Sequence, residues 1–343
     1  MSTQLSSFTM ARSRKVVALW LVITAAAVFL MILLGGATRL TGSGLSMVEW
    51  RPITGVIPPM DTQSWEAEFS QYKAHSEFQK INGHMELKDF KSIYLLEYIH
   101  RLWGRCLGLL LLLPLGVFWI KKWVNPPLVR HVSMTFLLGG LQGGMGWIMV
   151  KSGLGEDPHV SPIKLALHLL LAVWILWRLV WAALCVYTGK NYTFKNVSPF
   201  KFLVPFGVLV FTYGALVAGH KAGLIYNTFP LMGSDIFPAE LGAMGWRDVI
   251  YNPVTVQFIH RWMAVFFVAS IAIVVAQKSL HQATQRWLKG LLHLSLLQAT
   301  LGITTLLLNV QMHVALSHQA CGVLLILGLL MAAHTDQAIG LKR

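Results

Sequence analysis

Four histidines lie inside apolar stretches of the sequence, where an ionisable side chain is costly. They are His100, His168, His260 and His318. A polar side chain at membrane depth usually faces the interior of a helix bundle, and imidazole is a common ligand of haem iron and of zinc. The first hypothesis is therefore that these four side chains hold a metal or a metal cofactor.

The histidines occur in two related halves of the chain. Three pairs of segments match: GGATRLTGSGL (35–45) with GALVAGHKAGL (214–224), EYIHR (97–101) with QFIHR (257–261), and LQGGMG (141–146) with LQATLG (297–302). His168 then corresponds to His318. A repeat of this kind predicts two equivalent halves, 1–190 and 191–343. Each half contains one histidine pair: His100 with His168, and His260 with His318.

The paired arrangement favours haem over zinc. Counted from the expected helix starts, all four histidines lie roughly 8–12 Å into their helices at about 1.5 Å per residue, and hence at similar depth. Helix bundles build cofactor sites from facing side chains, whereas zinc usually takes four ligands around one ion. A single membrane histidine is also commonly a hydrogen-bonded packing residue. That alternative stays open, but repetition at one depth favours ligation.

Glu97 distinguishes the two halves. It precedes His100 by three positions and so lies on the same helical face, whereas its counterpart in the second half is Gln257. Only the first half then has an obvious acid-base group beside its histidines, which makes Glu97 the candidate catalytic residue. The alternative is a structural salt bridge from Glu97 to Arg101 or to a loop arginine.

Three arginines follow the histidine motifs: Arg101, Arg105 and Arg261. A guanidinium group binds a carboxylate through two parallel hydrogen bonds, so these side chains are candidates for holding haem propionates. They could instead extend to the membrane surface. We favour propionate binding and predict all three as cofactor-binding residues.

The elements that must position these residues are membrane helices. The chain has 343 residues, is 55% hydrophobic and 12% charged, and has a mean hydropathy of +0.59, values typical of a polytopic membrane protein. About 20 apolar residues span the hydrocarbon core. This rule predicts an all-α fold of two pseudo-symmetric four-helix bundles, with eight transmembrane helices at 16–38, 93–120, 131–151, 162–187, 200–219, 254–277, 287–309 and 313–334.

The basic residues predict the orientation of the chain. Despite a formal net charge of +14, the lysines and arginines lie in short segments between apolar runs, which argues against a nucleic-acid partner. They gather in the N-terminal tail, in alternate loops and at the C-terminus, where acids are almost absent. The positive-inside rule then places both termini in the cytoplasm, in a multi-pass protein of the cell (inner) membrane.

The segment 39–91 is long and mixed in charge, and would lie on the outer side. It begins with turn-forming glycines and prolines and becomes amphipathic around Trp65 to Tyr72. We expect short helices there that cover the membrane surface as a lid. The segment 227–252, which begins NTFPLMG, is its shorter counterpart in the second half.

Several segments resemble the haem A synthase family: GGATRLTGSGLSMVEWRPITGVIPP, EYIHRLWGR, AGLIYNTFPLMG and QFIHRW. The resemblance extends over nearly the whole chain. It implies a membrane oxidoreductase that converts a ring methyl of haem O to a formyl group by two successive hydroxylations and loss of water, giving haem A for cytochrome oxidase. The iron cofactor would supply the redox chemistry, and the protein its positioning.

The resemblance also implies how the halves divide the work. The family's ligating histidines correspond to His100 and His168, which would hold the substrate haem O in the half 1–190, and to His260 and His318, which would hold haem b in the half 191–343. The family's important glutamate corresponds to Glu97. No cysteine occurs between Arg39 and Lys91, so the chain resembles the cysteine-free alphaproteobacterial branch, and electron transfer through a loop disulfide is not expected.

Two other functions were weighed. A di-haem b-type cytochrome that relays electrons to or from quinone would need neither the acid beside one haem nor the lid. A haem or small-molecule transporter would place polar residues deeper, toward the cytoplasmic half. The expected partners are haem O, membrane lipid and an electron acceptor of unspecified identity. Contact with a haem O synthase and homo-oligomer formation are left open.

Overall fold

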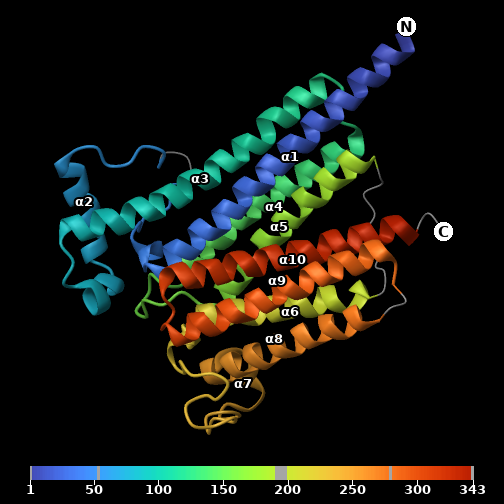
Figure 1. The fold of residues 1–343 in the computed structure, drawn as a ribbon. Helices are drawn as coiled ribbons and strands as arrows, with labels where there is room; N and C mark the ends of the chain where they lie inside the picture. Colours follow the sequence, from blue (N-terminus) through green and yellow to red (C-terminus); the bar gives the residue numbers. More distant parts are fainter. Residues whose placement is uncertain (1, 52–54, 190–198, 278–279, 341–343) are drawn as a thin grey trace. The chain divides into compact units, whose positions relative to one another are not determined.

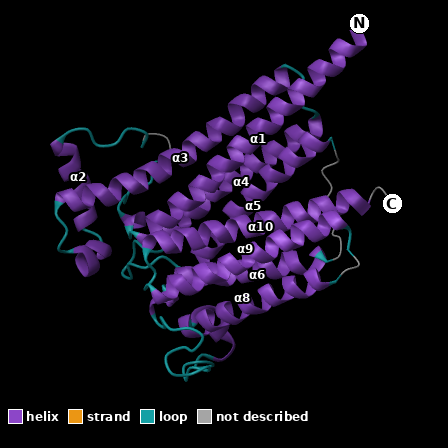
Figure 2. Ribbon diagram, viewed as in Figure 1, coloured by secondary structure: helices purple, strands orange, loops and turns teal. Residues whose placement is uncertain are grey.

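The computed structural model describes residues 2–51, 55–189, 199–277 and 280–340. Within these ranges the chain is almost entirely helix and loop (Figure 2), with a single isolated β-bridge between Met232 and Asp235. The chain divides into two compact units, Met1–Tyr192 and Thr193–Arg343. Figure 1 shows the long helices of each unit lying alongside one another.

The two units use the same helix arrangement. The first contains α1 (Ser2–Leu40), α3 (Leu87–Ile120), α4 (Pro126–Lys151) and α5 (Pro162–Thr188); the second contains α6 (Phe200–Gly219), α8 (Pro253–Ala276), α9 (Gln282–Leu307) and α10 (Met312–Gly340). In the first unit α1 packs on α3 and α5, and α4 packs on the same two helices. In the second unit α6 packs on α8 and α10, and α9 does likewise. The repeat inferred from the sequence is therefore a repeat of packing.

The described residues contain the eight expected long helices, and seven of them are long and apolar enough to cross a membrane. The eighth, α4, is 26 residues long, but the sequence GGLQGGMG in its middle lowers its hydropathy. Its glycines and its glutamine form the side of the helix that matters for the site described below. The all-α polytopic fold is confirmed.

The first loop (41–86) is attached to an extension of α3. The expected start of this helix at 93 is wrong by six residues, because Glu86 and Asp89 form a capping box that begins the helix at Leu87. The amphipathic segment is α2 (Thr62–Lys73). Its buried aromatic residues pack against Phe90 and Tyr94 of α3. The loop also contains the short helices η1 (Ser43–Leu45) and η2 (Phe78–Asn82).

The second loop (220–252) is organised around a buried carboxylate instead of an aromatic cluster. It contains η3 (Ala222–Leu224), η4 (Gly245–Arg247) and α7 (Asp248–Tyr251). Asp248 is 3% exposed and accepts hydrogen bonds from the backbone N–H groups of Gly242 and Met244 and from the side chains of Asn252 and Thr255. These bonds lower the pKa of Asp248 to about 2, with that from Thr255 the largest cause.

Candidate functional site: two histidine pairs

Each of the four histidines lies against a glycine of a neighbouring helix. A Cβ atom added at the glycine would meet the imidazole at 3.2 Å for Gly35 and His100, 3.1 Å for Gly146 and His168, 3.0 Å for Gly214 and His260, and 2.9 Å for Gly302 and His318. These distances are shorter than ordinary contacts of a real Cβ. The imidazole rings therefore use space that only glycine leaves.

The glycines repeat in the same way as the histidines. Gly35 on α1 and Gly214 on α6 are equivalent in the repeat, as are Gly146 on α4 and Gly302 on α9. In each unit the two partly buried histidines come from different helices and lie near enough for their charges to interact, His100 with His168 and His260 with His318. The structure thus brings together the pairs expected from the sequence.

Backbone carbonyls orient the two rings of the second unit. The Nδ1 atom of His260 lies 3.1 Å from the carbonyl oxygen of Val210, and Nδ1 of His318 lies 3.2 Å from that of Gln298. Each carbonyl belongs to the residue four positions before the adjacent glycine. A carbonyl can only accept, so Nδ1 carries the proton in both rings and Nε2 keeps its lone pair for a metal.

The equivalent ring of the first unit is held differently. Gln142, the counterpart of Gln298, donates from its amide Nε2 to the carbonyl oxygen of His168 at 3.0 Å, and the same Nε2 lies 3.2 Å from Nε2 of the imidazole. The Nδ1 atom of His168 is buried and has no hydrogen-bond partner. The side-chain amide of Gln142 therefore provides the hydrogen bond made to this ring.

These observations fit a haem better than a bare metal ion. The described residues contain no cluster of three or more histidine, cysteine or acidic side chains that could hold an ion, which disfavours a zinc site. A porphyrin supplies four nitrogen ligands and needs only one or two from the protein. The paired imidazoles, the glycines beside them and the available Nε2 atoms of His260 and His318 meet that requirement.

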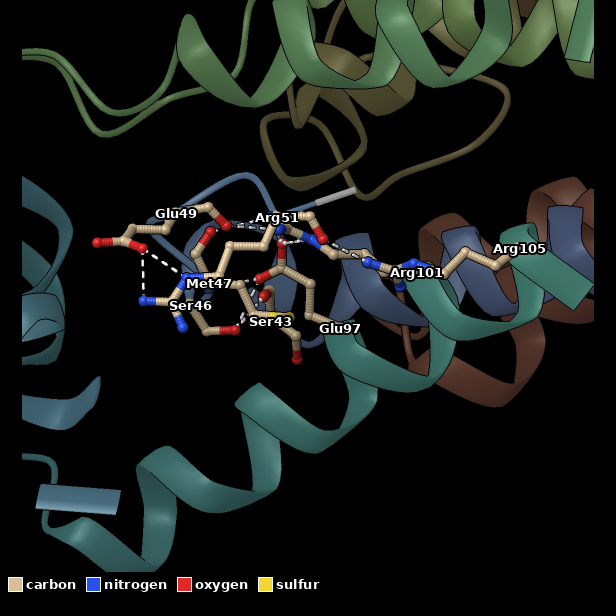
Figure 3. A network of polar contacts seen from close by, with 8 residues as sticks. All are labelled: Ser43, Ser46, Met47, Glu49, Arg51, Glu97, Arg101 and Arg105. Carbon is tan, nitrogen blue, oxygen red and sulfur yellow. Dashed lines mark hydrogen bonds and ion pairs between the residues drawn. The ribbon is translucent and has the colours of Figure 1, made fainter. Parts of the chain in front are cut away.

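Glu97 lies at the end of a polar network that connects α3 to the first loop (Figure 3). It is 3% exposed. One carboxylate oxygen accepts hydrogen bonds from the hydroxyl of Ser46 at 2.7 Å and from the backbone N–H of Met47 at 2.9 Å; the other accepts from Arg101 at 2.6 Å. The salt bridge to Arg101, which the sequence left as an alternative, is present. Whether Glu97 also acts in catalysis stays a prediction.

The counterpart network of the second unit lacks the carboxylate. Gln257 is 1% exposed and donates from Nε2 to the carbonyl oxygen of Tyr226 at 3.0 Å, while its Oε1 atom is buried without a partner. The position thus keeps its hydrogen bond to a loop but carries no charge.

The arginines fasten both loops at equivalent places. Arg101 donates to the carbonyl oxygens of Met47 at 2.8 Å and Glu49 at 3.0 Å. Arg261 donates to those of Tyr226 at 2.7 Å and Thr228 at 2.6 Å. When the alignment of 35–45 with 214–224 is continued, 47 corresponds to 226 and 49 to 228. The guanidinium groups therefore have a structural task that the sequence did not reveal.

Arg105 donates to the carbonyl oxygen of Arg51 at 2.8 Å. Together with Arg51 and Arg101 it lines a cavity of about 280 Å³ under the first loop, whose wall also includes Tyr94 and Glu68. The binding of propionates by Arg101, Arg105 and Arg261 stays a prediction.

Comparison with known proteins places the chain. The sequence model of the COX15-CtaA family, described as cytochrome oxidase assembly protein, matches residues 18–330. The chain belongs to this family. Among its relatives, the heme A synthase of Wolbachia pipientis is 42% identical, over 89% of this chain and 93% of the relative. Those of Nitrosospira multiformis and Rhodospirillum centenum are each 40% identical, over 94% of this chain and 93% and 88% of the relatives.

Sequence reasoning on this COX15-CtaA chain missed part of the site. It did not single out Gln142 and Gln298, nor the glycines, as neighbours of the histidines. The signal was present, because LQGGMG and LQATLG share both the glutamine and the final glycine, four residues apart on one helix face. The contacts of Ser46 and Met47 with Glu97 had no such signal, because a backbone N–H is common to nearly every residue.

Proposed function

We propose that the chain oxidises haem O to haem A. The observation that carries the proposal is the repeated histidine pair in two units of which only one has a carboxylate beside it. Membership of the COX15-CtaA family and the name heme A synthase of relatives at about 40% identity support it. An electron relay would have no need for this difference between the units.

In this proposal the two sites divide the work. His260 and His318 hold haem b, and each would be a rigid ligand because a backbone carbonyl fixes its ring. When bound, haem b supplies electron transfer. His100 and His168 hold the substrate haem O, with Glu97 one helical turn from His100. This division agrees with the positions of the fixed rings and of the charged carboxylate.

The substrate methyl loses hydrogens as it becomes a formyl group, so protons must leave the site. Glu97 is a carboxylate within a low-dielectric region and can accept a proton at an oxygen or stabilise positive charge that develops on the substrate. Arg101 and the Ser46 hydroxyl hold this carboxylate in one orientation. The first loop that they fasten would exclude bulk water from the reacting carbon.

Pigment extraction tests the proposal. The chain is produced together with a haem O synthase in a bacterial host that makes no haem A, and the extracted haems are separated and identified by mass spectrometry. We expect haem A together with haem b. The result that overturns the proposal is a protein fully loaded with haem b in membranes that contain haem O but no haem A, which would indicate a di-haem electron relay.

We also propose that both termini face the cytoplasm and that the segment 39–91 faces the periplasm. The basic N-terminal tail and the basic alternate loops support this orientation. Reporter fusions at the two termini and in the segment 55–60 test it. A periplasmic signal from the N-terminal fusion would invert the arrangement.

A further inference from the structure

Gln142 stands out because it places an amide in the middle of a membrane helix. A buried polar group in such a helix is costly unless its hydrogen bonds are satisfied. The amide of Gln142 is only half satisfied, since Nε2 is bonded while Oε1 is buried without a partner. A leucine there would avoid this cost, so the glutamine is retained against the packing preference of the helix.

The orientation of the amide follows from its partner. The carbonyl oxygen of His168 can only accept a hydrogen bond, so the atom 3.0 Å from it must be the NH₂ group. The second hydrogen of that group is available to Nε2 of the ring at 3.2 Å. One side chain thus contacts both the backbone and the imidazole of the same histidine, while Gly146, one turn further along α4, leaves room for the ring.

We propose that Gln142 is the positioning residue of the substrate-side ligand His168: its amide sets the orientation in which the imidazole meets the iron of haem O. This inference rests on the proposed function, because it takes His168 as a ligand of that haem. Nδ1 of His168 has no partner, so the amide supplies the hydrogen bond that resists rotation of the ring.

Gln298 provides a matched control within the same chain. Its amide Nε2 lies 3.5 Å from Nε2 of His318, at the limit of a hydrogen bond, and the ring is oriented instead by the backbone carbonyl of Gln298 at 3.2 Å. Truncating the side chain of Gln298 leaves that carbonyl in place. The same substitution should therefore have a large effect in the first unit and a small one in the second.

The experiment compares Gln142→Leu with Gln298→Leu in the full-length protein. Haem O is added to each purified protein, and the low-spin EPR signal, the optical spectrum and the haem O retained after gel filtration are measured. For Gln142→Leu we expect about 10-fold or greater loss of haem O retention or of haem A formation, the scale found when an outer-shell partner of a ligating histidine is removed, with a shifted or broadened EPR signal of the substrate haem.

The haem b signal of the second unit serves as the folding control and should be unchanged in Gln142→Leu. Gln298→Leu should resemble the wild type in all measurements. A Gln142→Glu variant, which has nearly the same shape but no NH₂ group, should share the defect of Gln142→Leu if donation by the amide is what matters.

Three outcomes would overturn the inference. These are an unchanged substrate-haem EPR signal in Gln142→Leu, equal effects of Gln142→Leu and Gln298→Leu, and full recovery in Gln142→Glu. A failure of the proposed function looks different, because the wild-type protein itself would then neither retain haem O nor form haem A.

Discussion

The two units share their scaffold and differ in charge at one position. In both, four helices pack in the same order, a glycine admits each histidine, and an arginine holds the loop by carbonyls at equivalent positions. In the first unit the residue before the histidine motif is the carboxylate of Glu97; in the second it is the amide of Gln257. The comparison shows that the chemical distinction does not require a different fold, only a different side chain at one place in it.

The loops differ more than the helices do. Aromatic packing against the extended α3 holds the first loop, whereas Asp248 and its hydrogen bonds hold the second. Loops tolerate change because their neighbours are few, while the packed helices do not. The following four predictions test which of these differences between the units matter.

The largest expected effect is the loss of haem b when a ligand of the second unit is removed. His260→Ala and His318→Ala should each lower tightly bound haem b by about 10-fold or more, because one axial ligand is lost. Optical and EPR spectra of the purified variants measure this. If either variant kept its full six-coordinate haem b, the assignment of this histidine pair as the ligands would be wrong.

The charge difference between the units is tested next. Glu97→Gln gives the first unit the side chain of the second while keeping its shape, and should lower haem A formation by about 100-fold or more, the scale of a positioned acid-base group. Haem extraction from cells that also produce haem O measures it. Haem b content is the folding control, and Gln257→Glu is the reciprocal variant, expected to leave haem A formation largely intact. Normal haem A from a fully loaded Glu97→Gln protein would make the carboxylate structural only.

The close contacts of the glycines predict a smaller, graded effect. A Cβ at position 302 would lie 2.9 Å from His318, and one at 35 would lie 3.2 Å from His100, so Gly302→Ala should be the more disruptive. Overpacking of this kind costs about 1–3 kcal/mol. Thermal unfolding and the EPR signal of haem b measure it. Gly290→Ala on the same helix α9 is the control, because no atom lies within 4 Å of the added Cβ; equal destabilisation by both variants would contradict the argument.

The smallest effect concerns the second loop. The pKa of Asp248 is lowered in the folded protein to about 2 from 3.8, so its ionised form stabilises the loop at neutral pH. That contribution is complete above about pH 4 and is lost as the pH falls through 2. Asp248→Asn should therefore make the second loop more sensitive to proteolysis at pH 7. The difference from the wild type should shrink as the pH approaches 2, which pepsin digestion can follow.

A difference of constant size from pH 7 to pH 2 would show that the side chain acts through its shape and not its charge. The first loop provides the internal reference, because its aromatic cluster does not depend on Asp248. Its cleavage should be the same in both proteins.

The sequence was sufficient to predict the helices and the histidine pairs, because hydropathy and exact motif repeats depend on side chains that can be read directly. It was insufficient where the backbone takes part. The capping box at Glu86 lies outside the apolar run, so the start of α3 was placed too late. The carbonyls of Val210 and Gln298 became visible as ring acceptors only once the helices were packed, since every residue has a carbonyl and the packing selects which one meets a histidine.

The network around Glu97 has a thermodynamic consequence. Ser46 and Met47 of the first loop are bonded to the same carboxylate that pairs with Arg101, so moving this part of the loop also changes the solvation of a buried charge. Such coupling is reciprocal. A ligand that requires the loop to open must bear the cost of exposing the carboxylate, and a proton taken up by the carboxylate in turn weakens the attachment of the loop. Access to the first unit and the charge inside it are therefore two readings of a single equilibrium.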